Sequence, residues 1–532
     1  MNSQQIFDCS PRQIPGIVLM LTLASLAGCT VGPKYHPPVT QAPTAYKEAP
    51  APVPATAAPN TTVDTGGSGS VQSTDTAQGS RDWRPASPAD AQLRGDWWTI
   101  FNEPELNRLE DQLNINNQNI KVYFEDLMQA RALIREARAQ YFPTFGTTPS
   151  WVREKSSGNL TNSQIAHTGA TTALYTLPFA LTWEPDLWGR VRNLVHEAEY
   201  SAQMSAADLE NERLTEQATL AGLYFEIRGQ DALIQLYAQT IKADQDALSY
   251  AQSQYETGLG DKAAAVLAEN TLQATQAQAT NLGILRAQYE HAIAVLVGQQ
   301  AERFSIARRP MVYSPPPIPI GVPSQLLQRR PDVAAAERNM AAANAEIGFA
   351  DAAFYPNLTL SAAGGTEASL AHQLLDWPSR FWSIGPTISE PIYEGGLRRA
   401  TVHQYIALYN ANLATYRQTV LTAFQQVEDS LSAVSILSQQ IRQQRDVVAT
   451  AQEGLDLEMA RYRTGLDPYV DVVTLQSALL LDQQTLASLQ ITQMTSAVQL
   501  IEALGGGWNV SQLPTPSQVE ATPPKQDRKI LR

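Results

Sequence analysis

The chain contains few cysteines, few basic residues and no long apolar stretch. Cys9 and Cys29 are the two cysteines among 532 residues, so the sequence cannot supply a disulfide framework. Lys and Arg number 38 against 52 Asp and Glu, which gives a formal net charge of −14. With no basic patch to neutralise phosphates, nucleic acid is not expected as a partner. Beyond the N-terminus, no stretch has the roughly twenty apolar residues of a membrane helix.

Motifs for catalysis, cofactors and metals are also missing. There is no Gly-x4-Gly-Lys-Ser/Thr phosphate loop, and the glycine cluster at 66–69 lies in a low-complexity stretch. His196 and His403 each stand alone, whereas a metal site needs three or four converging ligands, so a solvated helix face is favoured. We interpret Arg329-Arg330-Pro331-Asp332 as a structural turn with a helix cap at Asp332. The sequence therefore predicts no enzyme, cofactor or metal site, and energy for any transport must come from a partner.

Residues 1–28 are predicted to be a lipoprotein signal peptide. An apolar run of about eleven residues at 17–27 is too short to span a bilayer but suits a signal-peptide core. The run ends Leu26-Ala27-Gly28-Cys29, which resembles the bacterial lipobox. That resemblance implies that Cys29 carries acyl chains such as palmitate and becomes the mature N-terminus. An ordinary secretory signal with an incidental cysteine is the alternative. Thr30 stands where an aspartate usually marks inner-membrane retention, so the outer membrane is implied.

Residues 29–95 are expected to form the lipidated N-terminus and a disordered linker. Residues 40–93 are rich in Pro, Ala, Thr, Ser and Gly and poor in large apolar side chains. Such a segment cannot bury enough surface to offset the entropy of ordering it. We interpret it as a tether to the folded body, which begins near Asp96-Trp97-Trp98. Residues 509–532 are expected to be a C-terminal tail.

The body consists of two repeats of one unit, at 96–309 and 310–508. An alanine-rich helical run ends at Pro143 and again at Pro356, and a Tyr-x-Thr-Gly-Leu turn occurs at 255–259 and 462–466. Further matched pairs are Glu184-Pro185 with Glu390-Pro391, Gly189 with Gly395, and Gly298 with Gly505. Each half therefore has the order helix, strand, strand, helix, turn, helix, and this duplication fixes the architecture.

Two stretches in each half have the composition of unusually long helices. Nearly seventy residues between Gly189 and Thr257 lack proline and are rich in Ala, Leu, Glu and Gln. The same holds from Gly396 to Thr464. At about 1.5 Å per residue each would be on the order of 100 Å long. Such lengths indicate coiled-coil packing, and a structural coiled coil is one alternative for the whole chain.

Two shorter segments in each half have the alternation of β-strands. In residues 172–183 the odd positions are apolar and the even positions are mostly small or polar, and residues 382–389 alternate similarly. This period-two pattern is typical of transmembrane β-strands. Partner strands are predicted at 144–154 and 357–364, with external loops at 156–169 and 365–378.

Four strands are too few to form a membrane barrel alone. Outer-membrane barrels need at least eight, and each unpaired N–H or C=O in lipid costs several kcal/mol. The chain must therefore pool its strands with copies of itself, and symmetry favours a closed ring.

Several motifs closely resemble those of the outer-membrane efflux factors, the TolC-like channels, and specifically the lipoprotein branch called the NodT family. The similarity covers roughly residues 96–508. The motifs are Trp97-Trp98, Gln328–Val333, Ala335–Arg338, Ala341–Gly348, Ala352–Pro356, Tyr416–Leu421, Ala423–Asp429 and Leu504–Trp508. The resemblance implies a mainly α fold with a small β part. It also implies a homotrimer whose three sets of four strands close a twelve-stranded β-barrel, continued by a long α-helical barrel.

The same resemblance implies the outer-membrane channel of a tripartite efflux pump. Such a channel is a passive exit duct for drugs, solvents or other toxic small molecules, as in multidrug resistance. The implied partners are a periplasmic adaptor (membrane fusion protein), an inner-membrane pump of the RND type and outer-membrane lipids. The chain would be lipid-anchored in the outer membrane and extend into the periplasm. The alternatives are a type I channel that secretes proteins and a periplasmic coiled-coil lipoprotein without a pore.

The functional site is expected where the long helices reverse, because helices that meet at a closed tip can shut a pore. Adaptor contact is expected at Thr257, Gly258, Leu259, Thr464, Gly465 and Leu466. The resemblance places the periplasmic gate around 470–477, and the candidate gate residues are Asp467, Val470, Asp471, Thr474 and Ser477.

Two of these candidates depart from the family pattern. Many members have an aspartate and an arginine at the positions matching Thr474 and Ser477, so a gate salt bridge of that type is not expected here. Asp467 and Asp471 remain as acidic candidates, since rings of carboxylates in a pore favour cations. The alternative is that both are helix caps or solvated turn residues.

Overall fold

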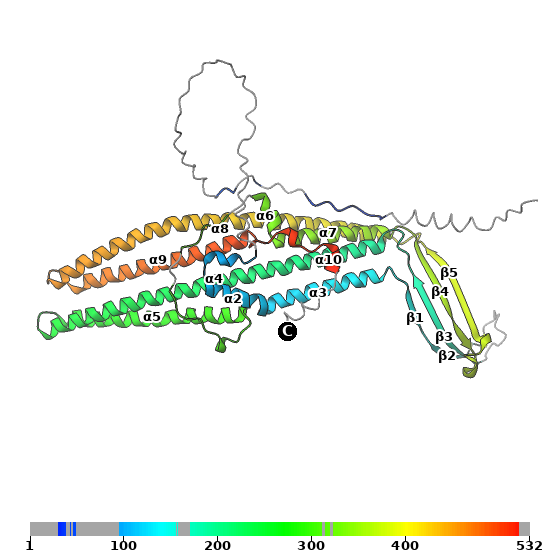
Figure 1. Ribbon diagram of the computed structural model, residues 1–532, viewed down its shortest axis with the longest axis horizontal. Coiled ribbons are helices and arrows are strands. Elements are labelled where there is room, and N and C mark those ends of the chain that lie inside the picture. The colour runs from blue at the N-terminus through cyan, green and yellow to red at the C-terminus, as the bar shows by residue number, and fades with distance from the viewer. Residues whose placement is uncertain are drawn as a thin grey trace, which may run out of the picture.

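The structure is a computed structural model that describes residues 30–38, 43, 46–48, 95–155, 157, 171–310, 314–319 and 323–520. The predicted signal peptide, Cys29, most of the predicted linker and residues 521–532 lie outside these ranges. Long helices run side by side along the body, and one sheet stands at its end (Figure 1). In the described part of the chain, no helix is both long and apolar enough to cross a membrane.

Two long helical hairpins form most of the body. The first joins α4 (Arg190–Glu256) to α5 (Lys262–Leu296), and the second joins α8 (Leu397–Arg463) to α9 (Tyr469–Ala503). The predicted long helices are confirmed, since α4 and α8 have 67 residues each, or about 100 Å. The shorter helices are η2 (Trp97–Phe101), α2 (Pro104–Asn116), α3 (Gln118–Ala139), η3 (Ala301–Arg303), α6 (Pro323–Arg329), α7 (Pro331–Ala352), η4 (Ala371–Gln373), η5 (Trp377–Ser379), η6 (Val510–Gln512) and α10 (Pro516–Glu520).

The lengths of the helices repeat between the two halves of the chain. The pairs α4 and α8, α5 and α9, and α3 and α7 have 67, 35 and 22 residues in both members. The hairpin helices begin 207 positions apart, at 190 and 397 and at 262 and 469. Helices α3 and α7 begin 213 positions apart, so the strands and their loops absorb the difference. The order of elements predicted for the duplicated unit is therefore confirmed.

All the strands of the described residues belong to one antiparallel sheet. β1 (Thr144–Thr147) and β2 (Ser150–Lys155) both pair with β3 (Thr171–Trp183). β3 then pairs with β4 (Asn357–Ala368), which pairs with β5 (Arg380–Ser389). Among the described residues, the outer edges of β1, β2 and β5 have no partner strand.

Two details of the predicted strands were wrong. The strand expected at 144–154 is broken in two, because Pro149 has no N–H with which to continue the ladder, although the pairing register is the same on both sides. The loop expected to begin at Gly365 begins after Ala368. Gly365 and Thr366 still pair with β3 on one side and β5 on the other, which keeps them in the sheet.

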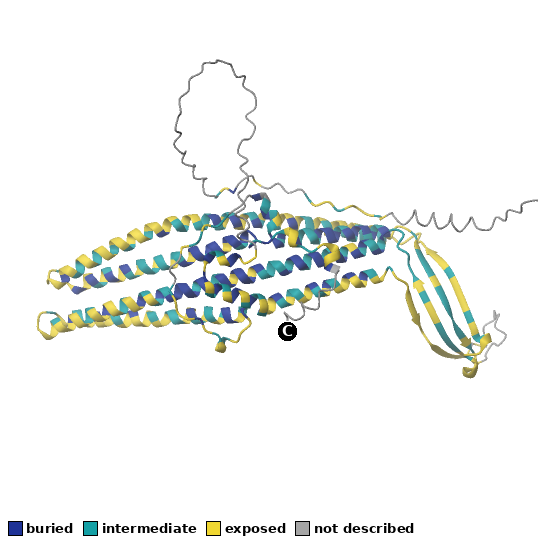
Figure 2. Cartoon of the chain, viewed as in Figure 1, coloured by how far each residue is buried: buried dark blue, intermediate teal, exposed yellow. Residues whose placement is uncertain are grey.

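One face of the sheet is apolar and lies open. Tyr175 pairs with Trp151, Leu181 with Phe145 and Gly364 with Trp382, which places these side chains on one face. No other layer of the chain covers the sheet, and Trp382 is 80% exposed (Figures 1 and 2). The opposite face carries small and polar side chains such as Thr176, Ser361 and Ser383. An apolar face of this size left exposed indicates contact with lipid or protein.

The hydrophobic core lies in the middle of the helical body, as the dark blue band of Figure 2 shows. Its largest cluster packs η2 and α2 against α4, with Trp97, Leu106, Tyr224 and Phe225 among its members. Residues beyond the second repeat belong to this body too, since Val519 of α10 is fully buried against α3 and α4. The part of the predicted tail that the structure describes is therefore packed.

The described N-terminal residues also contact the body, and they include three from the segment expected to be disordered, Tyr46, Lys47 and Glu48. Val31 donates its N–H to the Trp188 carbonyl (3.1 Å). Tyr46 is buried among side chains of α6, α7, α8 and α9. The backbone N–H groups of Lys47 and Glu48 both donate to the Glu428 carboxylate, at 2.8 and 3.0 Å. Backbone contacts of this kind order a segment whose composition alone does not.

Candidate functional site

The two helical turns that the sequence singles out both lie at the free end of the body. Gly258 and Gly465 have φ of 74° and 75°, a left-handed conformation that favours glycine and lets each hairpin reverse tightly. Leu259 and Leu466 are 83% and 72% exposed. The other residues expected to contact an adaptor, Thr257, Gly258, Thr464 and Gly465, are exposed as well. The structure therefore presents two matched turns, each with an apolar side chain pointing into solvent.

Aromatic residues hold the two hairpins together just behind these turns. Tyr462 and Tyr469 are buried beside Val472, Ala251 and Ala268, and the two tyrosine rings lie 5.1 Å apart. The Tyr462 hydroxyl donates to Oε1 of Gln254, across the hairpins, at 3.1 Å. A cleft of about 350 Å³ remains between the turns. Packing between the hairpins thus continues almost to the tip.

A buried polar contact joins the hairpins about three helical turns from the turn between α8 and α9. Gln476 of α9 donates through Nε2 to Oδ1 of Asp244 on α4, and both side chains are buried. Burial raises the pKa of Asp244, while the hydrogen bond from Gln476 opposes that rise. The second carboxylate oxygen of Asp244 has no hydrogen-bond partner. Low local dielectric makes such a contact strong and its loss costly.

The candidate gate residues lie on the exposed side of α9 or in its preceding turn. Val470, Asp471, Thr474 and Ser477 are all exposed. The hydroxyls of Thr474 and Ser477 donate to the carbonyls of Val470 (2.9 Å) and Val473 (2.8 Å) in the same helix. The described chain therefore gathers Val470, Thr474 and Ser477 on one face, where Asp471 is the nearby carboxylate.

Asp467 differs from the other candidates because it is already paired. Arg461 donates to both of its carboxylate oxygens, with 3.0 Å between Nη2 and Oδ1. This hydrogen-bonded pair lowers the pKa of Asp467. The geometry thus favours the turn-residue interpretation for Asp467 and leaves Asp471 as the acidic gate candidate.

A second group of charges lies buried in the middle of the body. The fully buried Arg228 of α4 donates through Nη1 to Oδ2 of Asp231 (3.2 Å) and to the Ala307 carbonyl (2.7 Å), and it pairs with Glu105. Arg286 of α5 donates through Nε to Oδ1 of Asp231 at 2.7 Å. The group joins α2, α4, α5 and the segment that follows η3. Sequence reasoning missed it, because its members are scattered along the chain and form no local motif.

The Arg330 region has a structural role, with one correction. Helix α7 starts at Pro331, so its N-cap is Arg330 and Asp332 is not the cap that was predicted. The Asp332 carboxylate instead pairs with the Arg330 guanidinium (2.6 Å) and accepts the Val333 N–H. Arg330 also donates to the Ala503 carbonyl, while its counterpart Asn117 donates to the Leu296 carbonyl in the first half.

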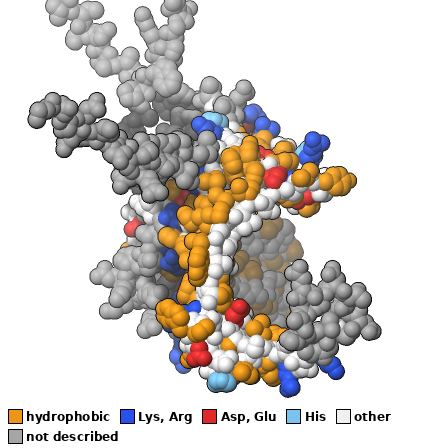
Figure 3. Space-filling model, turned by 90° about the vertical axis from the view of Figure 1, so that its right-hand side faces the viewer, with side chains coloured by type: hydrophobic (Ala, Val, Ile, Leu, Met, Phe, Trp, Pro, Cys, Tyr) orange, Lys and Arg blue, Asp and Glu red, His pale blue; other side chains and the backbone are white. Residues whose placement is uncertain are grey.

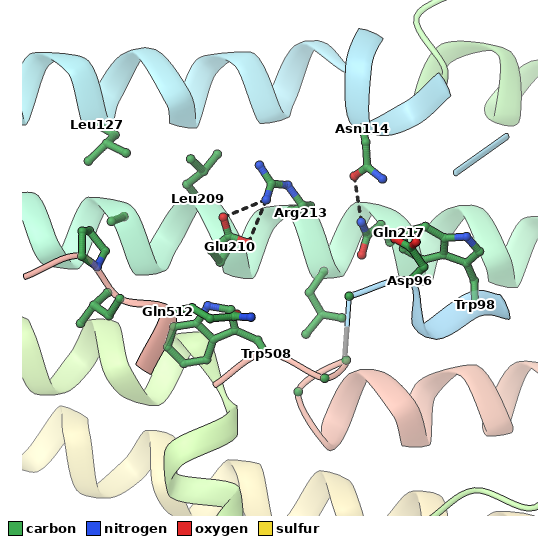
Figure 4. Close-up of a pocket in the computed structure, with 18 of the residues that line it drawn as sticks. Asp96, Trp98, Asn114, Leu127, Leu209, Glu210, Arg213, Gln217, Trp508 and Gln512 are labelled. Carbon is green, nitrogen blue, oxygen red and sulfur yellow. Dashed lines mark hydrogen bonds and ion pairs between the residues drawn. The ribbon is translucent and has the colours of Figure 1, made fainter. Parts of the chain in front are cut away.

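A cavity of about 680 Å³ lies beside α3 and α4 (Figure 4). Two pairs of its polar and charged lining side chains are hydrogen-bonded to each other. Arg213 donates to Glu210 (2.8 Å), and Gln217 donates to Asn114 (2.8 Å). In the described part of the chain, no group of three or more His, Cys, Asp or Glu side chains could hold a metal ion. His196 faces Glu199 alone, at 3.3 Å.

Comparison with known proteins gives one family. Residues 109–299 and 322–506 match the family described as outer membrane efflux protein. The solvent efflux pump outer membrane protein SrpC of Pseudomonas putida is 32% identical over 421 residues, 78% of this chain and 87% of the relative. The toluene efflux pump outer membrane protein TtgC of Pseudomonas putida is 29% identical over 495 residues, 92% of this chain and 95% of the relative.

Solved structures share the fold. The outer-membrane channel OprN is 26% identical with a TM-score of 0.76, over 90% of this chain and all of that one. The Neisseria gonorrhoeae MtrE outer membrane channel is 22% identical with a TM-score of 0.71, over 91% of this chain and 99% of that one. The likeness therefore extends over both repeats and the sheet.

Proposed function

This chain belongs to the outer membrane efflux protein family, and from that premise we propose that it is the exit duct of a tripartite efflux pump. Its place is the outer membrane, and the family consists of channels rather than enzymes. The observation that carries the proposal is an exposed apolar sheet joined to rods of about 100 Å in one chain. Relatives named for toluene and solvent efflux support small toxic molecules as the cargo.

We propose that three copies complete the pore. The free edges of β1, β2 and β5 leave unpaired N–H and C=O groups, which is too costly in lipid. Counting β1 and β2 as one interrupted strand, each copy supplies four strands, and three copies close a twelve-stranded barrel. The apolar face would then meet lipid and the polar face would line the lumen. The hairpins of three copies would continue as the α-helical barrel.

We propose the adaptor and the RND-type pump as partners because of the exposed leucines at the tip. Leu259 and Leu466 protrude from matched turns, and nothing in the described chain covers them. Such paired apolar side chains suit a docking surface for the adaptor. A neighbouring pump would supply the energy, since the described residues offer no nucleotide site.

Conductance and susceptibility together test the function. The purified protein is expected to be a trimer in detergent. In planar bilayers it is expected to conduct ions. A deletion strain is expected to become sensitive to solvents and drugs, with resistance restored by the intact gene. A conducting channel whose loss stops secretion of a protein, with susceptibility unchanged, would favour the type I alternative. A monomer that passes no current would favour the coiled-coil lipoprotein.

Within this pore, Asp471→Ala is expected to reduce cation selectivity. Three copies would place three carboxylates around the gate, and one carboxylate 4 Å from a passing cation contributes about 1 kcal/mol in bulk water. The ratio of cation to anion permeability should therefore fall severalfold. Asp467→Asn is the matched control and should change it little, because Arg461 already pairs with Asp467. Equal selectivity of the Asp471 variant and the intact channel would remove Asp471 from the gate.

We also propose that Cys29 carries the lipid anchor. Arg192 donates to the Thr30 hydroxyl at 3.3 Å, next to the point where α4 begins after β3. Thr30, the residue that follows Cys29, therefore lies at the sheet end of the body. Acyl chains on Cys29 would therefore start at the membrane surface.

Metabolic labelling with palmitate tests this anchor. Cys29→Ser is expected to abolish incorporation, since no other cysteine remains in the mature chain. Cys9→Ser, which alters the signal peptide alone, should incorporate palmitate as the intact chain does. Label retained by the Cys29 variant would rule out this residue as the anchor.

A further inference from the structure

The two free edges of the sheet carry the same pattern of side chains. On β2, which runs away from the helices, Trp151 is followed two and four residues later by Arg153 and Lys155. On β5, which runs back, Arg380 precedes Trp382 by two residues. Each edge therefore has a tryptophan and, beyond it, at least one cation.

All of these cations lie on the apolar face. Arg153 pairs with Ala173, two residues from Tyr175 on the same strand, and Arg380 pairs with Thr366, whose partner on β3 is Leu177. Side chains of a strand alternate between faces, so Arg153, Lys155 and Arg380 share the face of Tyr175 and Leu177. Figure 3 shows hydrophobic side chains gathered along the sheet, with Lys and Arg side chains near its lower end.

Arg153 and Lys155 lie just past the apolar band, and Arg380 lies level with Leu177, near the outer end of that band. From Trp183 to Tyr175 the apolar face of β3 covers about 27 Å, at roughly 3.4 Å per residue. That length is close to the apolar band of about 25 Å in membrane barrels, whose ends carry aromatic girdles. Trp151 pairs with Tyr175 and so marks the outer end of the band. Arg153 and Lys155 stand about 7 and 14 Å further along the strand, at the depth of lipid headgroups.

These three cations have no carboxylate to neutralise them. None of them forms an ion pair in the described chain, and the Arg380 guanidinium lies over the Trp377 ring at 3.7 Å. Glu154 and Glu367 belong to neighbouring positions but to the opposite face, by the same alternation. In a chain of net charge −14, this is a local excess of positive charge on a lipid-facing rim.

We propose that Arg153 and Lys155 of one copy and Arg380 of a neighbouring copy together bind the phosphate groups of lipid A, the anionic lipid of the outer leaflet. The inference rests on the proposed trimer, because β2 and β5 occupy opposite edges and meet when copies pair edge to edge. Guanidinium groups match phosphate oxygens with two parallel hydrogen bonds, and a flanking Lys adds a point charge. Each trimer would have three such sites, one at each seam, where the bound lipid bridges two copies.

The test uses the full-length lipidated protein, purified as the trimer and stripped of lipid in detergent. The probes are lipid A with its two phosphates and the same lipid after removal of both phosphates, and binding is followed by native mass spectrometry. The phosphorylated lipid is expected to bind at least about tenfold more tightly, since one hydrogen bond to a charged group contributes that much. The variant Arg153→Gln/Lys155→Gln/Arg380→Gln should lose this preference.

The controls separate this site from general charge and from the pore itself. Arg417→Gln/Arg442→Gln/Arg445→Gln removes three exposed cations of α8 and should keep the preference. Equal binding of both lipids to the intact trimer, or an unchanged preference in the first variant, would overturn the site. The intact-trimer comparison holds even if that variant fails to assemble. Oligomeric state and conductance of the intact protein are measured in parallel, so a monomer without current would instead overturn the proposed function.

Discussion

Arg228→Ala is expected to destabilise the folded chain by about 3–5 kcal/mol, the range for removing one partner of a buried ion pair. The Arg228 side chain is 0% exposed and contacts the Asp231 and Glu105 carboxylates and the Ala307 carbonyl. Alanine would leave Glu105 with the longer contact to Arg108 (3.9 Å) and Asp231 with Arg286 as its remaining charged partner. The expected results are a lower denaturant midpoint by circular dichroism and less assembled protein in the outer membrane.

The matched control for this change is Arg213→Ala. Arg213 also pairs with a glutamate on α4, at 2.8 Å from Glu210, but the two side chains are 37% and 32% exposed. Ion pairs in contact with solvent contribute about 0–1 kcal/mol, so the midpoint should move little. If both variants unfold at the same denaturant concentration, the buried group does not stabilise the packing of α2, α4 and α5 as we argue.

The large features of the fold could be predicted because their causes are local or repeated. An uninterrupted run of good helix formers predicts α4 and α8 within a few residues, and the recurring Thr-Gly-Leu turns locate both hairpin ends. Alternation of apolar and small residues predicts β3 and β5. The break between β1 and β2 was missed, although Pro149 marks it. Alternation of side chains alone does not show where a strand lacks the backbone N–H needed to continue its hydrogen bonds.

The contacts between distant segments could not be predicted in the same way. Arg228 and Glu105 are 123 positions apart, and Gln476 and Asp244 are 232 apart. A lone glutamine and a lone aspartate on long helices look like solvated residues until folding places them together. The binding of Tyr46 and Glu48 to the body was missed for a related reason, since composition describes the average of a segment and not its few anchoring residues.

The candidate gate shows where the resemblance helps and where it stops. The resemblance placed the gate in the α9 segment after the second turn, and the structure gathers those candidate residues on one exposed side. It could not decide whether Asp467 is a gate carboxylate or a turn residue. In the structure Arg461 pairs with Asp467 from the end of α8, six positions earlier, which favours the turn-residue interpretation.

Gln476→Ala is expected to loosen the tip and raise the fraction of time that the pore is open. Asp244 is 2% exposed, one of its oxygens has no partner, and the other would lose the Gln476 donor. Leaving a buried acceptor unpaired costs about 1–3 kcal/mol, and a charged one more. This cost destabilises the state in which the hairpins are packed together. The equilibrium ratio of packed to separated tips should therefore fall about 5- to 150-fold.

Single-channel recording of the purified trimer would measure this change as a higher open probability. Gln443→Ala removes an exposed glutamine of α8 and should behave as the intact channel. Uptake of drugs too large for the closed pore should rise in cells that carry the Gln476 variant. An open probability equal to that of the Gln443 control would show that the Asp244 contact does not hold the hairpins.

The same contact predicts how the tip responds to pH. Burial raises the pKa of Asp244 in the packed tip above its value in a separated, solvated one. The packed tip therefore binds a proton more tightly, and packing gains stability as the pH falls through that raised pKa. Open probability should decrease over this range in the intact channel. Asp244→Asn keeps an oxygen that can accept a hydrogen bond from Gln476 but cannot titrate. This part of the pH dependence of the open probability should therefore disappear in the variant. If the pH dependence persists, another group causes it.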